Sequence, residues 1–155
     1  MEYLPRIADT LLRERLEAFG AILVEGPKWT GKTTTAMQHA KSVIKMQDPD
    51  KADEYLETAA TMPSLLLKGE KPRLIDEWQD APKIWDAVRV AVDDSGGLPG
   101  QYILTGSNTV DKKKIRHTGT GRITRMKMYP MSLYESGESN GTVSLKELFD
   151  KRENE

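Results

Sequence analysis

The sequence contains no cysteine and only two histidines, His39 and His117. The absence of cysteine excludes disulfide bonds, thiolate nucleophiles and cysteine-ligated zinc sites, and two widely separated histidines do not form a metal motif by themselves. We therefore expect both histidines to be packing or surface residues.

The sequence also has no excess of positive or negative charge, and it has no long apolar run. Lys and Arg number 23 and Asp and Glu number 24, which gives a formal net charge of −1. Such a balance provides no global field that would attract nucleic acid or an acidic membrane. The longest aliphatic stretches, such as 65–67, are far too short to span a bilayer, and Glu2 and Arg6 stand where a signal peptide needs an apolar run. The sequence predicts a cytoplasmic protein without a membrane partner. Its net charge does not indicate a nucleic-acid partner, although a local basic patch is left open.

The 155 residues fit one domain, 1–155, that is long enough to bury a core. Short apolar runs predict strands at 21–24, 43–47, 73–76, 101–105 and 123–129. Helices are expected at 9–19 with Asp9 as the cap, at 31–41, at 53–67 with a break at Pro63, at 80–95 and at 145–149. This alternation predicts an α/β fold, a three-layer sandwich with a mainly parallel sheet, whose ligand site lies at the carboxyl ends of the strands.

One motif dominates the sequence. It is Gly26-Pro27-Lys28-Trp29-Thr30-Gly31-Lys32-Thr33, a full match to G-x-x-x-x-G-K-[ST], and it stands between an expected strand and an expected helix. We predict that this stretch, with Thr34, binds the phosphates of a nucleotide as a P-loop. The side chains of Lys28 and Trp29 are expected to point away from the phosphates.

Each position of this loop has a physical task. Gly26 and Gly31 let the backbone turn so that successive N–H groups point inward, and the following helix adds its positive end. Lys32 brings a mobile charge to the β and γ phosphates, and the Thr33 hydroxyl is placed to ligate magnesium. Thr34 is expected near the α phosphate.

Two acidic residues, Asp76 and Glu77, follow the apolar run 73–75. A P-loop needs a carboxylate at a neighbouring strand tip to hold magnesium, and Asp76 is the candidate. Glu77 is the candidate for polarising the attacking water, as a general base or an orienting group. The alternative is that both acids cap the next helix.

Polar and basic residues elsewhere supply further candidates. After the strand 101–105, Ser107 and then Asn108 are expected to sense the γ phosphate, with Thr105 beside them. Arg122 is the candidate for an arginine that reaches the transferred phosphoryl group, in the same chain or from a neighbouring subunit; further arginines with weaker claims are Arg89, Arg116 and Arg125. We expect Trp78 and Trp85 to pack in the core rather than stack on a base.

Six segments together resemble a known family. They are Tyr3-Leu-Pro-Arg6, the loop 26–33, Arg73-Leu-Ile-Asp-Glu-Trp-Gln79, Ile103-Leu-Thr-Gly-Ser107, Gly119-Thr-Gly-Arg122 and Pro130-Met-Ser-Leu-Tyr-Glu135. This set resembles the AAA-like (AAA_14) ATPase domain of bacterial and archaeal proteins that carry a DUF4143 domain. The resemblance implies an ASCE-type sheet, in which an extra strand separates the P-loop strand from the acidic strand, with Glu77 as the water-activating acid. It also implies a longer architecture, from which the C-terminal DUF4143 domain is absent here.

The leading functional prediction is a module that hydrolyses the β–γ bond of Mg-ATP and is coupled to a partner or to the absent domain. Its ligands are expected to be ATP and Mg²⁺, and a homo-oligomer or a protein partner can supply an arginine in trans. Three alternatives remain open: an ATP-responsive switch with little turnover, a small-molecule kinase with Arg116, Arg122 and Arg125 in a closing lid, and a GTPase. The GTPase alternative is disfavoured because Thr109 stands where the guanine-recognition pattern has lysine.

Overall fold

A computed structural model describes residues 2–107, 119–144, 146–147 and 149 of the chain. A single five-stranded sheet forms its centre, with the strand order β2-β3-β4-β1-β5. Every pairing in this sheet is parallel, so all the carboxyl ends of the strands lie along one edge. The predicted α/β fold is confirmed, and β4 separates β1 from β3 as the family resemblance implies.

The strands occupy the apolar runs of the sequence. Their bounds are β1 Ala21–Glu25, β2 Ser42–Lys45, β3 Arg73–Asp76, β4 Tyr102–Gly106 and β5 Ile123–Lys127. β1 and β4 are buried along nearly their whole length, which explains why both appear in the sequence as continuous apolar runs without alternation. β2 and β5 lie at the edges of the sheet and have exposed residues.

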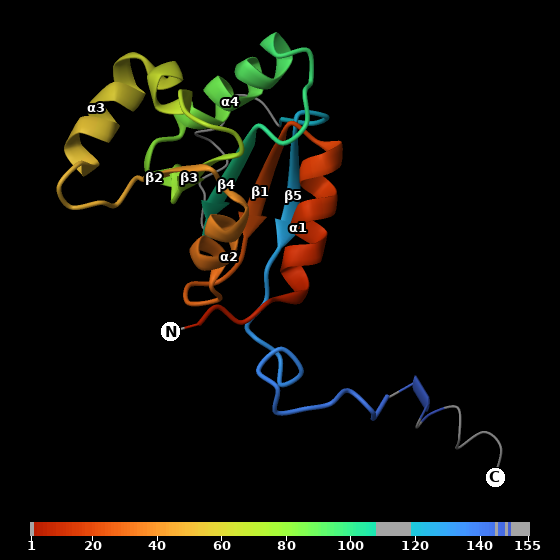
Figure 1. Cartoon of the computed structure of the whole chain (residues 1–155). Helices are drawn as coiled ribbons and strands as arrows, with labels where there is room; N and C mark the ends of the chain where they lie inside the picture. Colours follow the sequence, from red (N-terminus) through yellow and green to blue (C-terminus); the bar gives the residue numbers. More distant parts are fainter. Residues whose placement is uncertain (1, 108–118, 145, 148, 150–155) are drawn as a thin grey trace.

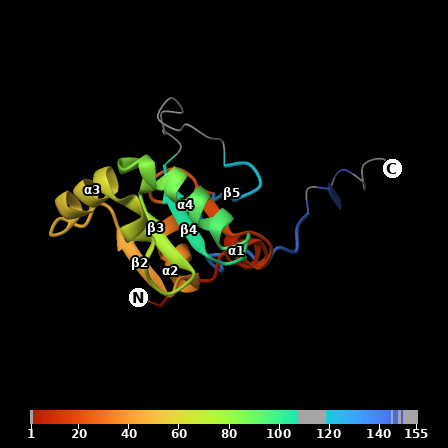
Figure 2. The same ribbon diagram turned by 90° about the horizontal axis from the view of Figure 1, so that it is seen from above.

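The described part of the chain has four α-helices and two 3₁₀ turns, of which α1 precedes the first strand and the others lie between strands. Their bounds are α1 Ile7–Ala18, α2 Lys32–His39, α3 Ala52–Thr61, η1 Pro63–Leu67, η2 Trp78–Asp80 and α4 Lys83–Asp94. In Figures 1 and 2, α1 and α2 cover one face of the sheet, and α3 and α4 cover the other. The molecule is therefore a three-layer sandwich.

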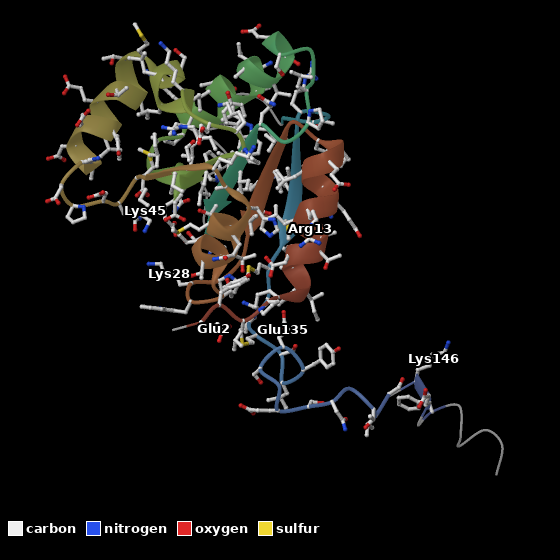
Figure 3. The ribbon with its side chains drawn as sticks, in the orientation of Figure 1. Glu2, Arg13, Lys28, Lys45, Glu135 and Lys146 are labelled. Atoms are coloured by element: carbon white, nitrogen blue, oxygen red, sulfur yellow. The ribbon has the colours of Figure 1, made fainter. Side chains whose placement is uncertain are left out.

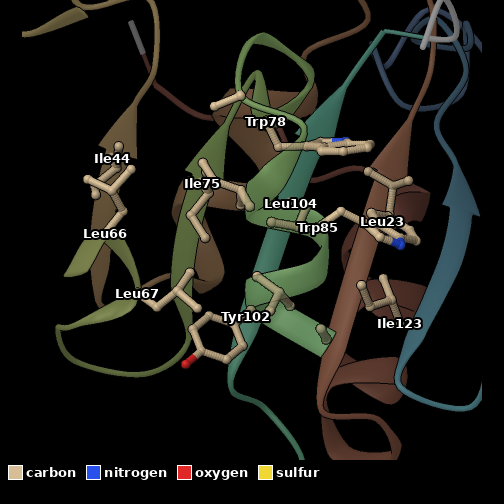
Figure 4. Packing of buried hydrophobic residues seen from close by; sticks show 14 of the residues in the cluster. Leu23, Ile44, Leu66, Leu67, Ile75, Trp78, Trp85, Tyr102, Leu104 and Ile123 are labelled. Carbon is tan, nitrogen blue, oxygen red and sulfur yellow. The ribbon is translucent and has the colours of Figure 1, made fainter. Parts of the chain in front are cut away.

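Alternation along the central strands divides the core into two clusters. Leu23 and Leu104 belong to the cluster under α3, η1 and α4 (Figure 4), while their neighbours Ile22 and Ile103 belong to the cluster under α1 and α2. Successive side chains of a strand point to opposite faces, so each buried strand contributes to both clusters. Burial on both faces fixes the position of the strand ends, where the candidate site lies.

Several predicted boundaries were wrong in detail. Asp9 does not cap α1: the helix begins at Ile7, and the Asp9 carboxylate accepts a 2.6 Å hydrogen bond from the backbone N–H of Arg6. α4 begins at Lys83 rather than at residue 80, because a 3₁₀ turn and Pro82 precede it. The last strand ends at Lys127, and the expected helix 145–149 lies partly outside the described residues.

Candidate functional site

The strand register brings the predicted site residues to one edge of the sheet. Glu25 of β1 is opposite Gly106 of β4, and Leu104 of β4 is opposite Ile75 of β3. Since β4 lies between β1 and β3, Ser107 follows β4 between the start of loop 26–33 and the end of β3. In Figure 1 this edge also carries the N-terminal segment and the chain that follows β5.

Loop 26–33 has the backbone geometry of an anion cradle. Gly31 has a φ of 87°, a left-handed conformation that glycine adopts without strain, and it precedes α2 directly. No side chain caps α2 and its first turn contains no acidic residue, so its first amide groups remain available to an anion. A Cβ atom at Gly26 would lie only 2.4 Å from the Met128 carbonyl oxygen, which excludes any larger residue there.

Two side chains of the loop turn back onto its own backbone. The Lys32 ammonium donates a 2.8 Å hydrogen bond to the Pro27 carbonyl, and the Thr30 hydroxyl donates one of 3.0 Å to the same oxygen. Lys32 is buried with 5% of its surface exposed, so its charge is held over the loop rather than in solvent. Lys28 and Trp29 are exposed, Trp29 fully.

Asp76 is the best-connected acid of the site. Its Oδ1 atom accepts two 2.6 Å hydrogen bonds, one from the Thr33 hydroxyl and one from the Thr105 hydroxyl. Asp76 is buried, and within the described residues no lysine or arginine forms an ion pair with it. A buried carboxylate without a basic partner is typical of a metal ligand.

Magnesium fits this arrangement. Thr33 and Asp76 present two hard oxygen atoms 2.6 Å apart, and Mg²⁺ prefers oxygen ligands while retaining several waters and binding substrate phosphates. Among the described residues, no group of three His, Asp or Glu side chains forms a dedicated metal cage. The donors therefore suit a metal that arrives with a nucleotide.

Glu77 has an unusual backbone conformation, with φ 57° and ψ 47°. For a residue other than glycine this left-handed geometry costs about 1–2 kcal/mol. Its N–H donates a 3.2 Å hydrogen bond to the Thr105 hydroxyl, and its carboxylate accepts one from the Gln79 side chain. The strain turns the chain at the end of β3, so that Asp76 and Glu77 both lie at the edge of the sheet.

The remaining predicted residues divide into two groups. Ser107 and Thr34 lie at the same edge as loop 26–33, Ser107 after β4 and Thr34 exposed on the first turn of α2. Arg122 lies at the opposite edge, because it directly precedes β5, and it pairs at 2.7 Å with Asp93 near the end of α4. The structure therefore does not bring Arg122 to loop 26–33 of its own chain. Asn108, Thr109, Arg116 and His117 lie outside the described residues.

The other arginines and the tryptophans have structural partners. Arg125 pairs with Glu25 at 3.1 Å, and Arg89 lies 3.8 Å from Asp86 and 3.7 Å from Asp93 on its own helix. The rings of Trp78 and Trp85 are buried with their centroids 4.9 Å apart, so both pack in the core as predicted. His39 pairs with Asp9 at 2.8 Å.

The sequence did not predict the roles of Thr105 and Gln79. Thr105 was expected beside the phosphate sensors, but it is fully buried and bridges Asp76 to the backbone of Glu77. Gln79 comes close enough to β4 that a Cβ atom at Gly106 would lie 2.8 Å from its Oε1 atom. Gln79 ends the segment 73–79 that carries the family resemblance. The residue spacing in that segment does not show which side chain Gln79 contacts.

A cavity lies away from this edge. It has a volume of about 1320 Å³ and opens between η1 and α4, with Leu67, Lys71, Val90 and Tyr102 among its lining residues. Tyr102 begins β4, so this cavity opens near the amino ends of the strands and is separate from loop 26–33. Within the described ranges, no helix is long and apolar enough to cross a membrane.

The strand order, together with loop 26–33 at the carboxyl edge of the sheet, defines a P-loop nucleoside-triphosphatase fold. In it, β4 lies between β1, which precedes the loop, and β3, which ends at Asp76. A family model described as an AAA domain (AAA_14) matches residues 18–137. The chain belongs to this AAA domain family and is a nucleotide-binding module of the ATPase type. No curated protein matches the chain.

One similar solved structure is a replication initiator DnaA bound to AMPPCP and single-stranded DNA. The two share 18% sequence identity with a TM-score of 0.45, and the match covers 97% of this chain. The chain spans 56% of the length of that structure. The likeness is too distant to carry the ligands over, and the fold assignment depends on the strand order and register described above.

Proposed function

We propose that the chain binds Mg-ATP at loop 26–33 and hydrolyses its β–γ bond. The observation that carries this proposal is the pair of hydrogen bonds that join Thr33, Asp76 and Thr105 at the carboxyl edge of the sheet. They tie the first turn of α2 to the tips of β3 and β4, which is the arrangement that a metal-bound triphosphate needs.

The phosphates are held mainly by backbone groups. The amides of Gly31 to Thr34 and the positive end of α2 receive the β and γ phosphates, while Thr34 lies nearest the α phosphate. The Lys32 ammonium exchanges its bond to the Pro27 carbonyl for phosphate oxygens. Ser107, next to the loop across the sheet, donates its hydroxyl to the γ phosphate.

Hydrolysis requires a positioned water. In this proposal Glu77 accepts a proton from that water, whose oxygen forms a bond to the γ phosphorus. The bond between the γ phosphorus and its bridging oxygen breaks, which yields ADP and inorganic phosphate. Mg²⁺, when bound, neutralises the charge that develops on the phosphate oxygens, and Thr33 and Asp76 are the residues that would hold it.

The predicted Arg122 does not reach the γ phosphate at loop 26–33 of its own chain. Arg122 lies at the far edge of its own sheet, so it can serve only the site of a neighbouring molecule. We include in the proposal a homo-oligomer or a protein partner that supplies this cation in trans, worth about 10³- to 10⁵-fold in rate. Coupling to a further C-terminal domain and a cytoplasmic location are parts of the same proposal.

A second candidate is an ATP-responsive switch with little turnover. The contact between the Gln79 amide and the Glu77 carboxylate favours it, because the Oε2 atom of Glu77 is engaged with Gln79 rather than with a water. In this candidate nucleotide binds tightly, and hydrolysis waits for a change that releases Glu77 from Gln79.

Phosphate release by the wild type and by Glu77→Gln tests the proposal. The variant should keep its affinity for Mg-ATP and lose about 10²- to 10⁴-fold in turnover. Unchanged turnover in a clean preparation would remove Glu77 from the mechanism. ADP formation that depends on an added acceptor would favour a kinase, and turnover that rises and saturates with protein concentration would favour an arginine supplied in trans.

A further inference from the structure

Two motifs that the nucleotide site does not use meet behind loop 26–33. Arg6, from the Tyr3-Leu-Pro-Arg6 motif, is buried with 8% of its surface exposed. Its guanidinium donates to the Thr30 carbonyl at 2.8 Å, to the Tyr129 carbonyl at 2.9 Å and to Glu135 Oε1 at 3.0 Å. One side chain thus joins the loop to the segment 129–135 that follows β5.

The contact with Thr30 determines the direction of a loop amide. The carbonyl of Thr30 and the N–H of Gly31 belong to the same peptide unit, and in a planar trans peptide they point to opposite sides. Because the carbonyl points to Arg6, the Gly31 N–H points away from Arg6. Arg6 also lies close behind the loop: a Cβ atom at Gly31 would be 3.3 Å from its Nη1 atom.

Arg6 is itself held by Glu135. The Glu135 side chain is 7% exposed and accepts hydrogen bonds of 2.8 Å from the Ile7 N–H, the Ser132 N–H and the Ser132 hydroxyl. Burial alone would raise the pKa of Glu135, but these bonds and the Arg6 guanidinium outweigh it and lower the pKa to about 2. Figure 3 places Glu135 at the same end of the molecule as Lys28 of the loop.

The backbone of Arg6 is fixed as well. Asp9 accepts its N–H at 2.6 Å and also takes hydrogen bonds from the Tyr3 hydroxyl at 2.7 Å and from His39 at 2.8 Å. His39 ends α2, the helix that begins at the loop. Arg6 is therefore positioned from both sides and does not adjust freely to the loop.

We propose that Arg6 is a positioning residue for loop 26–33, and that the Arg6–Glu135 pair couples nucleotide affinity to the conformation of segment 129–135. This inference rests on the proposed nucleotide site. A ligand or partner that moves the segment takes away two of the three acceptors of the guanidinium and loosens its hold on Thr30. By thermodynamic reciprocity, a bound nucleotide stabilises the segment in its present position.

The test compares Mg-ATP affinity by calorimetry in the wild type, Arg6→Gln, Glu135→Gln and the double variant. Arg6→Gln should weaken binding roughly tenfold, because a charge-assisted hydrogen bond to the loop is lost. Glu135→Gln should weaken it several-fold, and the double variant should be no weaker than Arg6→Gln, since the two residues act as one unit. Arg6→Lys should recover part of the loss.

Arg15→Gln is the matched control. Arg15 lies on α1, the helix that begins directly after Arg6, and donates to the Arg125 carbonyl of β5, away from the loop, so its loss should leave affinity unchanged. If the wild type binds Mg-ATP and Arg6→Gln binds it with the same affinity, only this inference is overturned. Wild type without affinity for Mg-ATP would overturn the proposed function and this inference with it.

Hydrogen exchange on the wild type keeps the inference testable if Arg6→Gln does not fold. The Ser132 amide, which donates to Glu135, should exchange about tenfold more slowly when Mg-ATP is bound. A purely structural role of the pair would not make this amide respond to nucleotide. Equal exchange rates with and without saturating Mg-ATP would contradict the coupling.

Discussion

The Thr33 hydroxyl and the Asp76 carboxylate lie 2.6 Å apart, although 43 residues separate them in the sequence. This contact joins the first turn of α2 to the tip of β3, with β4 lying between β3 and the loop strand. The two oxygen atoms that the proposed site would offer to Mg²⁺ are thus already adjacent in the folded chain. Preassembly of this kind reduces the cost of ordering the site when the nucleotide binds.

Replacing Thr105 tests the support of this pair. Thr105→Val keeps the shape of the side chain but removes the hydroxyl that donates to Asp76 and accepts from the Glu77 N–H. We expect a loss of about 1–3 kcal/mol in the free energy of unfolding, because two buried groups lose a partner. Urea unfolding measures this, with Thr10→Val on the exposed face of α1 as the control. A loss equal to that of the control would remove Thr105 from this role.

The low pKa of Glu135 predicts acid sensitivity. Its ordinary value of 4.5 falls to about 2 in the fold, so between these pH values the unfolded chain binds more protons than the native one. The free energy of unfolding therefore gains its full contribution above pH 4.5 and loses it as the pH falls toward 2. Allowing for solvent screening, the contribution is on the order of 2 kcal/mol.

The matching experiment measures urea unfolding from pH 2.5 to 7 in wild type and Glu135→Gln. The difference between the two proteins should be largest near neutral pH and shrink on acidification. A difference that stays constant over this range would mean that the carboxylate titrates alike in the folded and unfolded chains.

The Lys71 amine should be less basic than that of an ordinary lysine. Burial, together with the charge of Arg73, lowers the pKa of Lys71 from 10.5 to about 8. Its ammonium lies 3.8 Å from the centre of the Tyr102 ring, in the wall of the cavity between η1 and α4. Competitive reductive methylation followed by peptide mass spectrometry should give half-maximal labelling near pH 8. Labelling that tracks the exposed Lys41 across pH 7–10 would contradict this.

Much of the fold follows from local patterns. Short apolar runs located the five strands of the described part of the chain. β1 and β4 were the clearest, because both are buried on both faces and their polar residues, Glu25 and Thr105, come at or near the end of each run. The order of the strands was implied only by the resemblance to a family, since periodicity in a single sequence does not tell which strands are neighbours. The left-handed turn at Glu77 left no mark in the sequence, because glutamate rarely adopts it.

The site was predicted unevenly for a similar reason. The motif at loop 26–33 predicted Lys32 and Thr33 at the start of a helix that follows a strand, and the structure places them there. Arg122 was expected to reach the phosphates in its own chain or from a neighbouring subunit. It directly precedes a strand, and in a parallel sheet such a residue lies at the amino edge, so the first of these alternatives was wrong. The contact between Arg6 and Glu135 spans 129 residues, and no local pattern reports a contact of that length.

Calorimetric titration of the folded domain with Mg-ATP tests the central claim most directly, with wild type, Lys32→Ala and the exposed control Lys41→Ala side by side. The account predicts measurable binding by wild type and Lys41→Ala, and a loss of roughly a hundredfold in Lys32→Ala, since a charge-assisted bond to phosphate is removed. Equal heats in all three proteins, or no binding by a folded wild type, would contradict it.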